Sequence, residues 1–283
     1  MIATRTVQLF GLLDVVLPHT QLPMANEPFF TIEGTYYVPT PAARGPWNPN
    51  SLHGRVIAGL LGAEIERLHG SPDFIPARLT VDMYRLPDLS PVEVTTEVVR
   101  AGNRIKVIDA EFISGGVSAG RATCQLLKRT ENPSGNVWKP ATWDVPAPAD
   151  IAPPTDGRSG MGGMWATRRI VGDFGTVSQK RIWMSEVREL VEGRPLTPFV
   201  RVAVSADFAS PFANAGDGGL EFINSDVTVY LHREPATEWI GYEVINHGAT
   251  DGVALGECFV YDEQGPIGSA SCAALAQRRM ARS

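Results

Sequence analysis

Two short stretches, LTVDMYRLPD at residues 79–88 and VTVYLHREPA at residues 227–236, decide the fold, because they read as diverged copies of one strand. They begin 148 residues apart and match at a Thr, an Arg and a Pro. The matched pairs are Thr80 with Thr228, Arg85 with Arg233 and Pro87 with Pro235. Two further segments, ending at Arg129 and Arg278, repeat at a spacing of 149 residues. Near-constant spacing in two separate places predicts an internal duplication.

A stretch rich in Pro and Gly separates the two copies. Residues 131–164 carry no apolar period and are dense in Pro, Gly, Ser and Asp, which is typical of a linker over a surface. We therefore expect a first domain at residues 1–130 and a second at residues 165–283.

Each copy places a helix before a run of strands. In SLHGRVIAGLLGAEIERLHG, residues 51–70, apolar side chains recur at helical spacing, with Ser51 as the expected N-cap and Gly70 as the expected end. The expected apolar face is Ile57, Leu61, Ile65 and Leu68. In the second copy a less regular helix is expected within residues 196–215. The segments that follow alternate, are rich in β-branched residues and are separated by turn residues.

This order predicts an α+β protein with a tandem (double) hot-dog fold. Two antiparallel sheets would each wrap a central helix and join into one long sheet. Because a single copy leaves one edge strand unpaired, the chain should be a complete pseudo-dimer. A homo-oligomer of such chains would form through the outer faces of the sheets.

Composition excludes several classes of function. The net charge of −6 and the lack of any basic run argue against a nucleic-acid partner. Three cysteines with no CxxC motif argue against a disulfide framework or a zinc site, so we expect no metal and no cofactor. No apolar stretch approaches 18 residues and residues 1–22 lack a clean cleavage pattern, so we expect a cytoplasmic protein without a membrane partner.

The second copy also resembles a known family. Asp226, the pair His232-Arg233 and the pair Glu238-Trp239 stand in the order found in TesB-type acyl-CoA thioesterases, especially their actinobacterial relatives. The first copy is similar in GPWNPNSLHG, residues 45–54, and the resemblance covers most of residues 30–280. It implies an acyl-CoA substrate, hydrolysed without a metal or a covalent intermediate.

The resemblance also implies a catalytic carboxylate, which we assign to Asp226. The family is thought to use an Asp, a Gln and a Ser or Thr to orient and deprotonate a water molecule. Asn224 and Thr228 flank Asp226 and are the expected substrate-binding residues. The alternative is that Asp226 merely caps a strand.

The remaining family partners do not appear where they are expected. The Gln position falls at Cys272 or Ala273, neither of which positions a water as an amide does. His247 is a candidate second catalytic group, because an imidazole side chain can accept or donate a proton near physiological pH. The alternative is an exposed residue in a loop read from INHGAT, residues 245–250.

His53 and Gly54 begin the first helix and are the other expected substrate-binding residues. Free backbone N–H groups there could polarise a thioester carbonyl, while the alternative is that His53 only caps the helix. A hot-dog hydratase would need an Asp where Pro46 stands and a His two residues after Pro49, so that interpretation fails.

Other acids receive a structural interpretation. Glu64 and Glu66 are expected to face solvent, and Asp82 aligns with Tyr230 in the repeat and is expected to be structural.

Three functions follow from these residues. The first is hydrolysis of acyl-CoA at Asp226, at one site between His53 and the strand of Asp226. The second is binding of acyl-CoA or an acyl carrier without turnover, because the Gln is missing. Hydration is a distant third.

Overall fold

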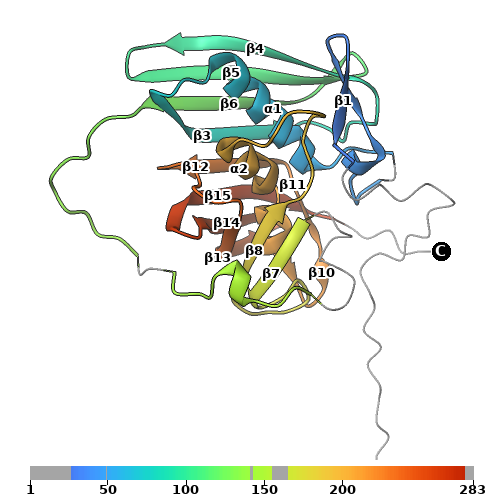
Figure 1. Ribbon diagram of the computed structural model, residues 1–283. Coiled ribbons are helices and arrows are strands. Elements are labelled where there is room, and N and C mark those ends of the chain that lie inside the picture. The colour runs from blue at the N-terminus through green and yellow to red at the C-terminus, as the bar shows by residue number, and fades with distance from the viewer. Residues whose placement is uncertain (1–26, 49, 141–142, 155–164, 278–283) are drawn as a thin grey trace, which may run out of the picture.

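The computed structural model describes residues 27–48, 50–140, 143–154 and 165–277. Within these residues thirteen strands form one sheet, and its order is β1-β2-β4-β5-β6-β3-β12-β15-β14-β13-β8-β7, with β11 paired to β15 (Figure 1). In this sheet the other strands of the first copy lie on one side of β3 and the strands of the second copy lie on the other side, while β9 and β10 pair with each other in a separate two-stranded sheet. The expected joining of the two sheets into one is confirmed.

The first copy contains one long helix and six strands. These are β1 (Phe30–Glu33), β2 (Tyr36–Pro39), α1 (Gly54–His69), β3 (Phe74–Met83), β4 (Val92–Ala101), β5 (Ile105–Ser114) and β6 (Val117–Lys128), with the short 3-10 helix η1 (Pro41–Ala43) before α1. Ile57, Leu61 and Ile65 are buried as expected, but Leu68 in the last turn is 49% exposed. The N-cap is His53 rather than Ser51, and the helix ends at Gly70 as expected.

The second copy has the same plan with a broken helix. It contains β7 (Trp165–Val171), β8 (Arg181–Glu186), α2 (Pro198–Ala206), α3 (Ala209–Asn214), β9 (Ala215–Gly216), β10 (Gly219–Leu220), β11 (Phe222–Asn224), β12 (Asp226–Leu231), β13 (Ile240–Thr250), β14 (Val253–Asp262) and β15 (Gly265–Ala276). The segment expected to be a loop at residues 245–250 instead belongs to β13, paired along its length with β14. A bulge near Ile245 had obscured its alternation in the sequence.

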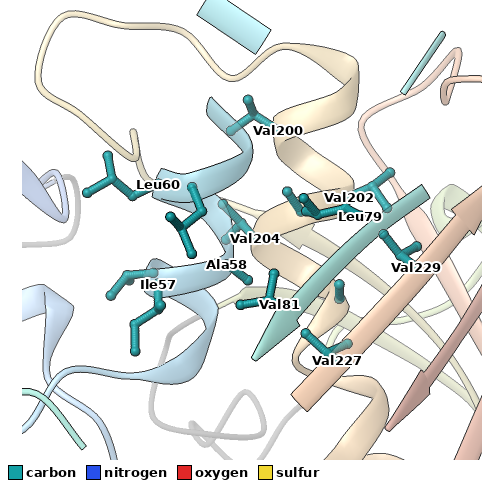
Figure 2. Packing of buried hydrophobic residues seen from close by; sticks show 14 of the residues in the cluster. Ile57, Ala58, Leu60, Leu79, Val81, Val200, Val202, Val204, Val227 and Val229 are labelled. Carbon is teal, nitrogen blue, oxygen red and sulfur yellow. The ribbon is translucent and has the colours of Figure 1, made fainter. Parts of the chain in front are cut away.

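The two copies meet where β3 pairs with β12. Thr80 lies directly opposite Thr228 in the register, and their hydroxyl oxygens are 3.2 Å apart. These two residues are also equivalent in the repeat, so the pseudo-two-fold axis passes between them. On the helix side of this junction, Leu79 and Val81 lie beside Val227 and Val229, buried beneath the helices (Figure 2).

The helices α1 and α2 pack against each other over this junction (Figure 1). Their approach is close because α1 carries glycines at the contact: a Cβ at Gly62 would lie 2.9 Å from the Cβ of Ala203. Each helix begins beside the end of the other, since His53 contacts Asp207 and Thr197 contacts Glu66. The pair is therefore antiparallel, with two pseudo-equivalent ends.

The linker packs on the second copy at residues 143–154, whereas its residues 131–140 are exposed. It contains a short 3-10 helix, η2 (Pro148–Asp150). Trp143 stacks on Tyr261 with ring centroids 4.1 Å apart, and Trp183 donates a hydrogen bond from Nε1 to the carbonyl of Pro146. Among the helices of the described residues, none is long and apolar enough to cross a membrane.

Candidate functional site

A buried polar cluster lies where α1 begins and α2 ends. His53 precedes α1, Asp207 follows α2 and Asn224 ends β11. His53 Nδ1 lies 3.4 Å from Asp207 Oδ2, and the Asn224 amide donates to Asp207 Oδ1 at 3.0 Å. The cluster draws on both copies, since His53 belongs to the first copy and Asp207 and Asn224 belong to the second.

The imidazole of His53 is held in one orientation and one tautomer. Its Nδ1 accepts a hydrogen bond from the Arg55 backbone N–H at 3.1 Å, which places the hydrogen of the neutral ring on Nε2. Burial lowers the pKa of His53, which favours the neutral ring at physiological pH. Within the described part of the chain Nε2 has no hydrogen-bond partner. A buried N–H donor without a partner is costly unless a ligand supplies the acceptor.

The carboxylate of Asp207 is pressed against the first residue of α1. A Cβ on Gly54 would lie 2.7 Å from Asp207 Oδ2, so only glycine allows this approach. The side chains of His53 and Asp207 are 7% and 9% exposed, so both are nearly closed off from solvent. The Asn224 amide also donates to the backbone carbonyl of Asp226, which fixes its orientation toward Asp207.

Of the residues in this cluster, the sequence indicated His53, Gly54 and Asn224 as candidates, but not Asp207. Its signal was an acid inside the otherwise apolar run VAVSADFASPF, residues 202–212. An acid buried there needs polar partners, but the sequence does not show that His53 and Asn224 supply them.

Asp226 and Thr228 do not reach this cluster. Val227, Val229 and Leu231 of β12 face the helices, so Asp226 and Thr228 point to the opposite face of the sheet. Asp226 Oδ1 accepts from the backbone N–H of Ala273 at 2.8 Å. Burial raises the pKa of Asp226, while the hydrogen bond from Ala273 opposes this rise. The structure therefore does not bring Asp226 together with His53.

Asp82 has a different neighbour from the one that the repeat suggested. It aligns with Tyr230 in the repeat, but in the sheet it lies opposite Asp226. Its carboxylate accepts from Arg121 Nε at 3.0 Å on the exposed face. This pairing is consistent with the structural role expected for Asp82.

His247 lies apart from the cluster, on the strand β13. Its Nδ1 lies 3.0 Å from Asn214 Oδ1, and the Asn214 amide lies 3.7 Å from the buried Sγ of Cys272. The position where an amide was expected thus holds a buried thiol. The amide that contacts Asp207 belongs to Asn224, while the amide of Asn246, next to His247, donates to Glu257 Oε2 at 2.7 Å.

A buried ion pair lies beneath the start of α1. Arg55 Nη1 donates to Glu186 Oε2 at 2.8 Å, and the guanidinium lies 4.2 Å from the centroid of Trp165. Burial lowers the pKa of Arg55 to about 10 and raises that of Glu186. Trp165 in turn lies edge-on to His53 with centroids 6.2 Å apart. The pair therefore fixes both the helix start and the ring beside His53.

Two further acids on α1 differ from expectation. Glu64 is buried rather than solvent-facing, and it accepts from Arg67 and Arg194. Glu66 is half-buried and accepts from the Thr197 hydroxyl at 2.5 Å. Within the described ranges, no group of three or more His, Cys, Asp and Glu side chains is arranged to hold a metal ion.

Comparisons with known proteins agree with this architecture. Residues 43–127 match the family model of the acyl-CoA thioesterase N-terminal domain, and residues 142–274 match that of the C-terminal domain. A comparison with curated proteins finds no match.

Several solved structures share the fold at low sequence identity. A hot-dog-fold protein from Alicyclobacillus acidocaldarius is 16% identical with a TM-score of 0.70, covering 89% of this chain and 96% of that one. The tesB protein of Mycobacterium avium subsp. paratuberculosis is 15% identical with a TM-score of 0.64, covering 87% and 95%. An acyl-CoA thioesterase II from Mycobacterium marinum is 16% identical with a TM-score of 0.61, covering 88% and 95%.

Proposed function

Since this chain belongs to the TesB-like family of double hot-dog acyl-CoA thioesterases, we propose that it hydrolyses acyl-CoA thioesters with Asp207 as the general base. The observation that carries the proposal is the contact of Asp207 with His53 and Asn224, across the two copies. It joins a buried carboxylate to a neutral imidazole with a free N–H donor.

Thioester hydrolysis needs a general base for the attacking water and a hydrogen-bond donor for the oxygen of the attacked carbonyl. Asp207 takes a proton from water, and the water oxygen adds to the thioester carbon. His53 Nε2–H donates to the oxygen of that carbonyl, which becomes negative in the tetrahedral intermediate. Collapse breaks the C–S bond, and the thiolate takes up the proton that Asp207 removed from water, which restores the Asp207 carboxylate. The balanced products are a carboxylic acid and free CoA thiol.

Asn224 serves as a positioning residue for the base. Its amide holds Asp207 Oδ1, which leaves Oδ2 toward His53 and the start of α1. An amide that fixes the carboxylate reduces the reorganisation needed when the proton is transferred. In this proposal Asn224 supplies the amide that the sequence does not place at Cys272.

A second function, acyl-CoA binding without turnover, is favoured by one observation. His53 and Asp207 are so nearly closed off that substrate entry requires side chains to move. A protein that keeps this cluster closed would bind acyl-CoA and release no thiol.

Thiol release from a panel of acyl-CoAs tests the proposal. We expect wild-type turnover, and a loss of about 10²- to 10⁴-fold in kcat for Asp207→Asn, the usual range for removal of a base. Asp226→Asn is the matched control, because it removes the sequence-based candidate from the other face of the sheet. Activity that survives in Asp207→Asn but disappears in Asp226→Asn would return the base to Asp226. Binding without turnover in the wild type would favour the second function.

A further inference from the structure

The chain that runs from β11 into β12 has one residue more than the partner strand β15 can pair with. The two register pairs on either side of the extra residue are Asn224 with Ala274 and Thr228 with Ser271. Between them, the backbone N–H of Ser225 donates to the carbonyl of Ala273 at 3.0 Å. Ser225 and Asp226 therefore both lie opposite Ala273, which is the arrangement of a β-bulge.

This bulge determines which face of the sheet Asn224 occupies. In a regular strand, residues three positions apart point to opposite faces. Asn224 and Val227 are three positions apart, yet both face the helices, since Asn224 contacts Asp207 and Val227 is buried beneath the helices (Figure 2). Without the extra residue, Asn224 would lie on the outer face with Asp226 and could not reach Asp207.

Asp226 supplies two of the hydrogen bonds that hold the bulge. Its Oδ1 accepts from the Ala273 backbone N–H at 2.8 Å, in the place of a backbone carbonyl. Its own backbone carbonyl accepts from the Asn224 amide at 3.2 Å. On the side of the first copy, the Ser225 carbonyl accepts from the Met83 backbone N–H at 2.8 Å. Asp226 thus connects β15 to the amide that holds the proposed base.

Resting on the proposed function, in which Asp207 is the base, we propose that Asp226 is a positioning residue that acts on Asp207 through Asn224. The Asp226 carboxylate closes the bulge, and the bulge turns Asn224 toward the helices. The Asn224 amide then holds Asp207 Oδ1 at 3.0 Å. This role needs a hydrogen-bond acceptor at the place of Asp226 Oδ1, whereas a general base there would need the negative charge.

Two conservative variants of Asp226 give opposite orders of activity for these two roles. Asp226→Asn keeps a carbonyl acceptor at the same length without the charge, while Asp226→Glu keeps the charge and moves it by one methylene group. Because misplacement by about 1 Å can cost up to 100-fold, we expect kcat to fall about 10-fold or more in Asp226→Glu and at most about 3-fold in Asp226→Asn. Thiol release from one acyl-CoA measures both. KM should stay within about 2-fold, as expected when the loss falls on the transition state.

Truncation of Asp226 tests whether its effect passes through Asn224. Asp226→Ala removes the acceptor and should lower kcat about 10- to 100-fold in the wild type, but less than about 2-fold in an Asn224→Ala background. Asp82→Ala is the matched control, because it removes the carboxylate that lies directly opposite on the same face, and its kcat should stay at the wild-type value. If Asp226→Ala does not fold, the order of the Asn and Glu variants still tests the proposal.

The activity of Asp207→Asn separates this inference from the proposed function. If Asp207→Asn abolishes turnover while the three Asp226 variants keep the wild-type kcat, Asp207 remains the base and the inference fails. The inference also fails if Asp226→Glu is more active than Asp226→Asn, or if Asp226→Ala lowers kcat equally with and without Asn224. If Asp207→Asn stays active but Asp226→Ala lowers kcat only when Asn224 is present, the link from Asp226 to Asn224 stands and the assignment of the base is overturned.

Discussion

The two ends of the antiparallel pair α1 and α2 share a plan but differ in chemistry. At one end the N-cap of α1, His53, contacts Asp207 at the end of α2. At the other, the N-cap of α2, Thr197, contacts Glu66 near the end of α1. Duplication of the fold explains why each helix begins beside an acid on the other.

Burial distinguishes the two contacts. His53 and Asp207 are both buried, and His53 keeps an N–H donor without a partner among the described residues. Thr197 is exposed, and its hydroxyl already donates to Glu66. Glu66 also borders an open cavity of about 300 Å³, which contains no imidazole. Pseudo-symmetry thus supplies two equivalent positions, but of the two only the His53 end combines burial with an N–H donor that has no partner among the described residues.

The largest expected difference comes from truncating the two N-caps. Both His53→Ala and Thr197→Ala remove a helix cap and should cost about 1 kcal/mol in the free energy of unfolding. Only His53→Ala also removes the carbonyl donor, so its kcat should fall about 10²- to 10³-fold in the thiol-release assay. Equal kcat values in the two folded variants would show that His53 only caps its helix.

Gly54→Ala should have a smaller effect through the position of Asp207. A Cβ there would lie within 2.7 Å of Asp207 Oδ2, so the carboxylate must shift. Because misplacement of a catalytic group by about 1 Å can cost up to 100-fold, we expect a loss of roughly 10- to 100-fold in kcat. Gly62→Ala is the control: its Cβ would crowd Ala203 instead, lowering the melting temperature while kcat is retained. A Gly54→Ala variant with wild-type kcat would contradict the close approach to the base.

The smallest expected effect is a difference in pH dependence between the two ends. Burial lowers the pKa of His53 below 6.5, so the unfolded state binds a proton there before the folded state does. The contribution of His53 to the free energy of unfolding should therefore decrease as the pH drops below 6.5. Burial raises the pKa of Glu66 above 4.5, so the folded state binds its proton first and stability from that end should rise on acidification.

Urea unfolding of the wild type, His53→Asn and Glu66→Gln between pH 4 and pH 8 measures both slopes. Asn keeps the cap at position 53 without titrating in this range. Each difference curve should have a slope of at most about 1.4 kcal/mol per pH unit, with opposite signs at the two ends. Slopes of the same sign would mean that either His53 or Glu66 is not in the buried environment described above.

The fold could be predicted from the sequence because duplication leaves a trace in the strands. Thr80 and Thr228 are equivalent in the repeat and lie opposite each other in the sheet, so the repeat alone indicated the junction. The strands β1, β2, β7 and β8 were missed, because they lie outside the matched segments. Part of β13 was taken for a loop, since a bulge interrupts its alternation.

The candidate site could be predicted only in part. His53, Gly54 and Asn224 stand at the end of an element, where local sequence indicates a free polar group. Asp207 lies in an apolar run between α2 and α3. One of its partners, His53, is more than a hundred residues earlier in the chain, and the other, Asn224, ends the strand β11. Asp226 satisfied the family pattern, but the alternation of β12 turns its side chain away from the helices.

The central claim is that the end holding Asp207 is catalytic and the pseudo-equivalent end holding Glu66 is not. The most direct measurement is kcat for Asp207→Asn and Glu66→Gln on one acyl-CoA, each folded variant made by the same replacement of a carboxylate by an amide. We predict a loss of about 10²- to 10⁴-fold for Asp207→Asn and a change of less than about 2-fold for Glu66→Gln. A loss of similar size in both variants, or a loss confined to Glu66→Gln, would contradict the account.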